Sequence, residues 1–270
     1  MSNSIALGRS SPESAVSDTV TEANSAAGTS FKWRFGIALF LIIEALLAFA
    51  PLAILGPAIG WPASLRNPAA QQLAAIAAAP AALSLGYSIY LLYSLAILPV
   101  AVIVAWRVTG LNGKLSALIV ALGALSALSR VIGILRWLTV MPMLATSYAA
   151  ADPATRVAIE LTFSAINSYG GGIGEVLGVA LFGGLWLAVA MLAASGMSGR
   201  ARTLPRWLII FGGASALLQM ALALPAFGIA MHVPVAGAVT AFVLWLIAFA
   251  VQLVVAPNST ARVASRQSST

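Results

Sequence analysis

The chain of 270 residues contains no cysteine and a single histidine, and only 8% of its residues are charged. The absence of cysteine excludes disulfides, thiolate nucleophiles and cysteine metal sites. His232 has no second metal-ligating residue at a fixed spacing, so we expect neither a metal site nor a triad of serine, histidine and acid. No cofactor is therefore expected.

The chain has long apolar runs instead. Apolar residues make up 61% of it, and its mean hydropathy is +0.99. A helix that spans a bilayer needs about 20 mostly apolar residues, and six runs are long enough. They are apolar on all sides, unlike the one-sided helices of a soluble protein. The sequence thus predicts an all-α fold, a polytopic bundle of six transmembrane helices over residues 31–257. The predicted spans are approximately 35–57, 81–106, 116–145, 163–195, 208–231 and 234–256.

The basic residues lie mostly on one side of the predicted spans. The formal net charge of +7 could indicate a nucleic-acid-binding protein, but no basic cluster with aromatic residues lies on a soluble face. Arg66 and Arg156 alone fall in the predicted outer loops. By the positive-inside rule, both termini are predicted to be cytoplasmic, with the lipid bilayer as partner and no nucleic acid. The ten predicted inner residues are Arg9, Lys32, Arg34, Arg107, Lys114, Arg200, Arg202, Arg206, Arg262 and Arg266.

Both ends of the chain are polar. Residues 1–30 are rich in Ser, Ala and Thr and have no apolar segment of the kind found in a secretory signal. Residues 258–270 are similarly polar. We expect two disordered cytoplasmic tails on either side of the membrane domain.

Three stretches depart from a plain alternation of spans and loops. Residues 63–80 are too polar to span and predict an outer loop with a short interfacial helix. The stretch 154–195 is too long for one straight crossing, so we expect an outer helix to about Ser168, a break or kink at the following glycines, and then the span. Pro225 is expected to bend the fifth span.

Five charged residues lie in or beside the apolar runs: Glu44, Arg130, Arg136, Glu160 and Glu175. A charge at the centre of a bilayer costs about 2.5–3.5 kcal/mol on insertion scales, so it usually faces the protein interior with a partner. If the fourth span begins at the glycines, Glu160 falls near the outer surface. Depth along the helices then predicts two pairs, Arg130 with Glu44 and Arg136 with Glu175. These four residues are the candidate ligand-binding or ion-pair set.

Gly170, Gly174 and Gly178 recur at every fourth position. A phosphate-binding loop would need a following Lys-Ser or Lys-Thr, which is absent. Small residues at this spacing let two membrane helices approach closely. We therefore interpret the three glycines as helix-packing or helix-breaking residues.

One segment resembles a known family. The sequence AINSYGGGIGEVLGVALFGGLWLAVAMLAASG, a short basic turn and LPRWLIIFGGASALLQM are similar to a family of bacterial six-span membrane proteins classed as a domain of unknown function. The resemblance covers about residues 160–220, with the Tyr169-Gly170 pair, the run from Phe182 to Trp186 and the Leu204-Pro205-Arg206 turn. It implies a small helical bundle in a bacterial cytoplasmic membrane and supplies no activity.

Three functions remain open at this stage. The leading prediction is a non-enzymatic protein that binds or moves a small polar or lipidic molecule through a pocket lined by the buried charges. The second is a structural or partner-binding subunit, homo-oligomeric or with another protein, in which the charges only stabilise the bundle. The third is an intramembrane enzyme acting on lipid, with Glu175 or Glu44 as base; it ranks last because a neighbouring arginine keeps a carboxylate ionised.

Overall fold

The computed structural model describes residues 31–111, 113–196, 204–231 and 233–255. Both predicted tails, His232, Arg200 and Arg202 lie outside these ranges. Contacts divide the chain into two units, one formed by residues 1–40 and 250–270 and the other by Leu41–Phe249. In the first unit, Arg34 Nε donates a hydrogen bond of 2.6 Å to the carbonyl oxygen of Leu253.

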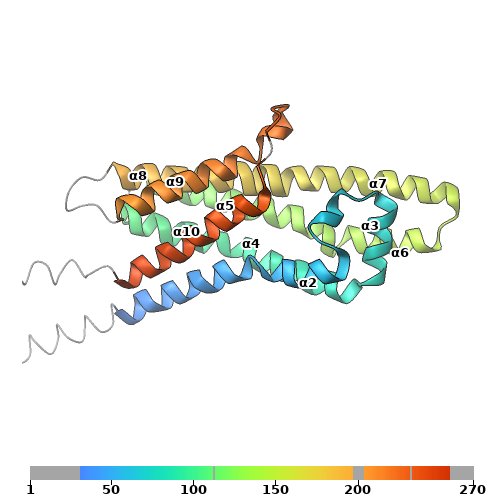
Figure 1. Cartoon of the computed structure of the whole chain (residues 1–270), viewed down its shortest axis with the longest axis horizontal. Coiled ribbons are helices and arrows are strands. Elements are labelled where there is room, and N and C mark those ends of the chain that lie inside the picture. The colour runs from blue at the N-terminus through green and yellow to red at the C-terminus, as the bar shows by residue number, and fades with distance from the viewer. Residues whose placement is uncertain (1–30, 112, 197–203, 232, 256–270) are drawn as a thin grey trace, which may run out of the picture. The chain divides into compact units, whose positions relative to one another are not determined.

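The regular elements of the described ranges are all helical. A helix over residues 31–47 comes first. The elements that follow are α2 (Ala50–Ile59), η1 (Ala63–Arg66), α3 (Ala69–Ala78), α4 (Pro80–Thr109), α5 (Gly113–Leu138), α6 (Val140–Ala150), α7 (Pro153–Gly171), η2 (Gly172–Phe182), α8 (Gly183–Ser195), α9 (Arg206–Ala221), η4 (Leu224–Phe227) and α10 (Val235–Val255) (Figure 1). The segment η1 and α3 occupies the stretch for which a short helix is predicted.

Within the described ranges, five helical stretches are long and apolar enough to cross a membrane, so the chain is an integral membrane protein. They are Phe31–Ile59, Pro80–Thr109, Gly113–Ala150, Pro153–Ser195 and Val235–Val255. The predicted span over 208–231 is wrong in extent, because α9 ends at Ala221 and has 16 residues. Pro225 lies in the short η4 turn, and Gly228 follows it with a φ of +78°. Proline cannot donate the backbone hydrogen bond that would continue the helix, so the chain turns here.

No break interrupts the fourth helix at the glycines, where a break or kink is predicted. Helix α7 passes without interruption into η2, which is π-helical, and then into α8. Gly171 and Gly172 keep helical backbone angles, with φ of −64° and −56°. The irregularity is thus a change of helical winding, of the kind that often marks functional sites.

Helix α7 begins as its sequence predicts. Asp152 Oδ1 accepts hydrogen bonds from the backbone N–H groups of Ala154 and Thr155, at 2.9 and 3.0 Å, and Pro153 occupies the first turn. The Thr155 hydroxyl and these N–H groups hold the pKa of Asp152 below its ordinary value. A carboxylate suits the positive end of a helix, so this cap favours helix initiation at this point.

Helix α5 is the central element of the second unit. It packs against α4 on one side and against η2 and α8 on another. Glycines let the backbones meet: a Cβ on Gly133 would lie 2.6 Å from the Cα atom of Gly174. The Ser126 hydroxyl donates a buried hydrogen bond of 2.7 Å to the carbonyl oxygen of Gly178. These contacts fix the register of α5 and η2, and with it the depth of their charged residues.

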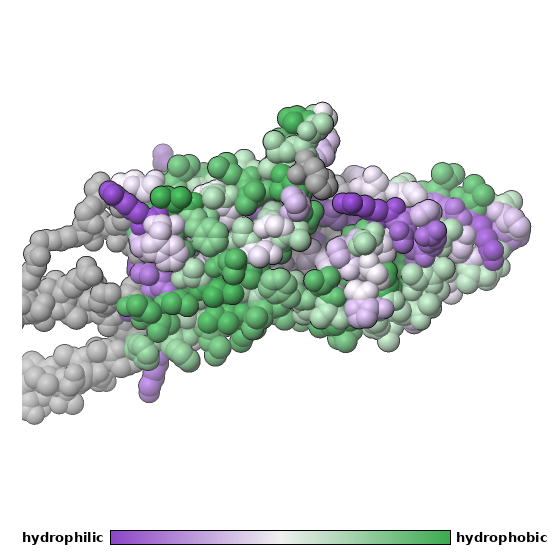
Figure 2. Space-filling view, in the orientation of Figure 1, coloured by the Kyte–Doolittle hydropathy of each residue, from purple (hydrophilic) through white to green (hydrophobic). Residues whose placement is uncertain are grey.

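The surface in Figure 2 is mostly hydrophobic over α9 and α10, and hydrophilic residues gather over the end that carries η1, α3 and α7. Beneath that end lies a core of apolar and aromatic side chains, in which Tyr87 stacks on Trp137 with ring centroids 4.9 Å apart and Phe163 packs edge-on against Trp137. A second aromatic group joins Trp186 of α8 to Phe242 and Trp245 of α10.

Candidate functional site

Glu44 and Arg130 lie together in the interior of the second unit. Their side chains are 1% and 5% exposed, respectively. The charge of Arg130 acts on the Glu44 carboxylate, yet neither carboxylate oxygen accepts a hydrogen bond. Nε of Arg130 is buried and also has no hydrogen-bond partner. The two opposite charges are therefore neighbours, but neither is satisfied through hydrogen bonds at these atoms.

The guanidinium of Arg130 is surrounded by residues from several helices. It lies over the ring of Tyr93 on α4, 6.0 Å from the ring centroid. A Cβ on Gly183 would lie 3.1 Å from Nη2 of Arg130 and 3.1 Å from Oε1 of Gln219 on α9, so these two side chains are neighbours. Gly178 lies against the Arg130 backbone and the first part of its side chain. Glycine at 178 and 183 thus leaves the space that the arginine occupies.

Further buried polar atoms of α4 and α9 also lack partners. Among the described residues, the buried atoms without a hydrogen-bond partner include Nε2 of Gln219, the hydroxyl of Ser215 one turn earlier on α9, and the hydroxyl of Ser94, which follows Tyr93 in α4. A buried polar group left without a partner costs about 1–3 kcal/mol, and a charged one more. We name the set formed by Glu44, Tyr93, Arg130 and Gln219 the central polar cluster.

Arg136 and Glu175 form a second polar group on α5 and η2. Arg136 Nε donates a hydrogen bond of 3.2 Å to Oδ1 of Asn167, and its Nη1 donates to the carbonyl oxygen of Gly133. Its side chain crosses Gly170, where a Cβ would lie 2.6 Å from Cδ of the arginine. The charge of Arg136 acts on the Glu175 carboxylate, but the Glu175 side chain is exposed.

The structure therefore brings each arginine within electrostatic range of the glutamate predicted for it. Their pairing stays a prediction, because the hydrogen bonds of Arg136 go to Asn167 and Gly133 and the Glu44 oxygens have none. The three glycines of the predicted packing stripe all face α5: Gly170 lies on Arg136, Gly174 on Gly133, and Gly178 on Arg130. Glu160 accepts a hydrogen bond from the Tyr148 hydroxyl, away from both clusters.

A row of tyrosines on α4 lies near both polar groups. The rings of Tyr90 and Tyr93 have centroids 6.1 Å apart. Tyr90 is within electrostatic range of Arg130 as well as of Arg136 and Glu175. Tyr93 in turn is within range of Glu44. Tyr90 and Tyr93 thus lie within electrostatic range of the charged residues of both polar groups.

Sequence reasoning missed Gln219 altogether and gave Tyr93 no specific role. A signal for Gln219 was present, because a glutamine inside an apolar run is costly unless it faces a polar neighbour. Tyr93 could not have been singled out, since the three tyrosines of α4 are three residues apart and only contacts show which one covers Arg130.

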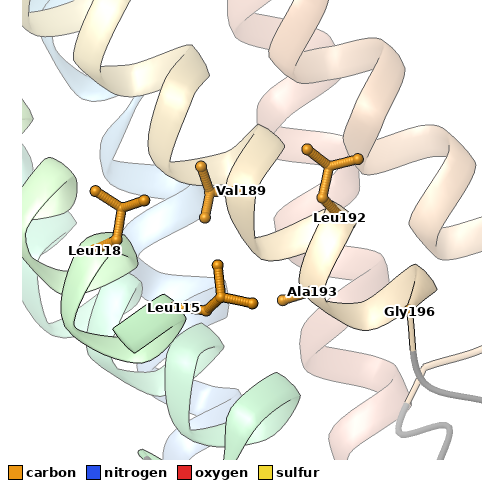
Figure 3. A pocket seen from close by; sticks show the side chains of 6 residues that line it. All are labelled: Leu115, Leu118, Val189, Leu192, Ala193 and Gly196. Carbon is orange, nitrogen blue, oxygen red and sulfur yellow. The ribbon is translucent and has the colours of Figure 1, made fainter. Parts of the chain in front are cut away.

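A groove of about 460 Å³ lies between α5 and α8, far along these helices from the polar clusters (Figure 3). Its lining is apolar, and it lies within two candidate membrane spans. The side chains that line it have no hydrogen-bonding groups, so the groove offers no polar chemistry. The residues that line it are Leu115, Leu118, Val189, Leu192, Ala193 and Gly196.

Within the described ranges, no three histidine, cysteine, aspartate or glutamate residues come close enough to hold a metal ion. The central polar cluster presents opposite charges and hydrogen-bonding groups. In a comparison with known families, the model of the domain of unknown function DUF4386 matches residues 30–250. No curated protein and no solved structure matches the chain.

Proposed function

The chain belongs to the DUF4386 family, and we propose that it binds and moves a small polar or lipidic molecule through the central polar cluster. The observation that carries the proposal is the state of Glu44, a fully buried carboxylate near an arginine, with both oxygens lacking hydrogen-bond donors. Burying an ion costs several kcal/mol unless close contacts and hydrogen bonds compensate it. A guest that supplies those hydrogen bonds would offset this cost.

The row of tyrosines supports a route to the cluster. Glu175 is exposed, Tyr90 is half-buried and Tyr93 is buried, so exposure falls step by step toward Arg130. Polar side chains at membrane depth are tolerated where they face the protein interior or line a water-filled cavity.

We further propose six spans with both termini in the cytoplasm of a bacterial cell. Helix α9, with 16 residues, is about 24 Å long, and a short span of this kind is accommodated by local thinning of the bilayer. The excess of basic residues in alternate loops supports this orientation. Fusions of alkaline phosphatase and green fluorescent protein after Thr109, Ala151 and Phe227 test it. We expect phosphatase activity only at the last two.

Cysteine labelling tests the proposed function, because the chain has no cysteine of its own. Single cysteines are placed at Glu175, Tyr90 and Ser94, and a membrane-impermeant thiol reagent is applied from either side. A transporter should show labelling of Tyr90→Cys and Ser94→Cys from both sides, as the route opens alternately. Leu244→Cys is the control: its side chain is 52% exposed on an apolar helix, so the polar reagent should not reach it in lipid. No labelling at either position from either side would refute the proposal.

A further inference from the structure

We infer that the ligand of the central polar cluster is a small zwitterion, a molecule that carries one cationic hydrogen-bond donor group and one anionic acceptor group. This inference rests on the proposed function and specifies its substrate class. It follows from the arrangement of the unpartnered polar atoms around Arg130 and Glu44.

The cluster has an acceptor end and a donor end. At one end, the two oxygens of Glu44 are buried and accept no hydrogen bond. At the other end, Nε of Arg130 and Nε2 of Gln219 are buried donors without acceptors, on side chains that are neighbours across Gly183. A complementary guest presents donors to the glutamate and acceptors to the arginine and the glutamine.

Charge then distinguishes among guests that could make these hydrogen bonds. With Glu44 and Arg130 both ionised, the formal charge of the cluster is zero. A guest with one charge would satisfy the hydrogen bonds of one end only and bring a net charge into the membrane interior, which is costly. A zwitterion supplies an opposite charge to each end and keeps the total at zero. A neutral amide offers hydrogen bonds but no charge compensation.

The same surroundings limit the size of the guest. Gly178 and Gly183 pack so closely on Arg130 that a single Cβ would lie 2.9 Å from its Cγ and 3.1 Å from its Nη2, respectively. The Tyr93 ring covers the guanidinium from α4. This close packing on two sides of Arg130 excludes a bulky guest there and favours one of a few heavy atoms.

The experiment measures binding to the full chain in lipid nanodiscs with matched small probes. The zwitterions are glycine, β-alanine and γ-aminobutyrate, which differ in the spacing of their charges. Acetate lacks the cation, methylamine lacks the anion, and acetamide lacks both. We expect at least one zwitterion to raise the apparent melting temperature and to bind saturably, and the other three probes to do neither at the same concentration.

Charge variants should switch this preference. With Glu44→Gln, the cluster becomes cationic, so zwitterion binding should weaken about 30-fold or more, and acetate should now bind. With Arg130→Gln, methylamine should bind instead. Lys114→Gln removes a positive charge from the exposed start of the same helix and should leave the preference unchanged.

Two outcomes would overturn the inference: binding of acetate or methylamine to the unchanged protein as tightly as any zwitterion, or binding of no zwitterion. These outcomes are read from the unchanged protein, so they do not depend on the variants folding. Failure of the inference differs from failure of the proposed function, because labelling of Tyr90→Cys and Ser94→Cys requires no ligand. Labelled positions with no zwitterion binding would leave the proposed function standing and remove the substrate class.

Discussion

Replacing Gly133 by alanine should force α5 away from η2. The new Cβ would lie 2.6 Å from the Cα atom of Gly174 and 3.0 Å from the carbonyl oxygen of Gly170, both of which are backbone atoms. Ordinary contact begins at 3.4 Å, so the two helices would have to separate by about 0.8 Å. Overpacking of this kind costs about 1–3 kcal/mol, and the better helix propensity of alanine returns up to about 1 kcal/mol. The net loss of stability should be about 1–2 kcal/mol.

The assay is the apparent melting temperature in a fixed lipid or detergent, followed by tryptophan fluorescence. For a chain of this size, the loss corresponds to a fall of about 2–8 °C. Gly213→Ala is the matched control, because a Cβ there meets nothing within 4 Å, and it should be neutral or slightly stabilising. If Gly133→Ala melts at the same temperature as Gly213→Ala, then the close packing of α5 on η2 is not a feature of the folded protein.

Three further changes test other contacts. Ser126→Ala removes the buried hydrogen bond to the carbonyl oxygen of Gly178 and should cost about 0.5–1.5 kcal/mol, measured as a lower melting temperature; no change would mean that water replaces it. Trp245→Phe removes the donor to the Leu208 carbonyl oxygen and should cost about 1–3 kcal/mol, whereas an unchanged melting temperature would show that α9 and α10 do not depend on this bond. Asp152→Ala should lower the melting temperature at neutral pH. The pKa of Asp152 is held below its ordinary value of 3.8, so its contribution is complete above that value and lost as the pH falls further below it. A difference between the two proteins that stays constant down to pH 2 would contradict this role.

Much of the fold could be predicted because hydropathy reports directly on membrane spans. The predicted second span, 81–106, corresponds to α4, and the predicted sixth, 234–256, corresponds to α10 within a residue or two. The end of α9 at Ala221 was harder to predict, because the residues that follow are just as apolar as the helix. Hydropathy measures where a segment prefers to lie, and it does not record where the backbone turns.

The π-helical segment and the central polar cluster depend on contacts between helices, which hydropathy does not report. Glycines in a membrane helix predict either close packing or a break, and only the opposing Gly133 on α5 favours packing. The sequence predicts a similar depth for Glu44 and Arg130, since each lies a countable number of residues from the end of its predicted span. Their lack of hydrogen bonds could not be read, because it depends on side-chain directions and on Gln219, which comes from a helix 89 positions further along the chain than Arg130.

The most direct test of the account is a density map of the full chain in lipid nanodiscs at a resolution that shows small molecules. We expect density that belongs to no protein atom between the Glu44 carboxylate and the side chains of Arg130 and Gln219. If instead Glu44 and Arg130 are in direct hydrogen-bonded contact, with nothing between them, then the two charges only hold the bundle together and the cluster is not a binding site.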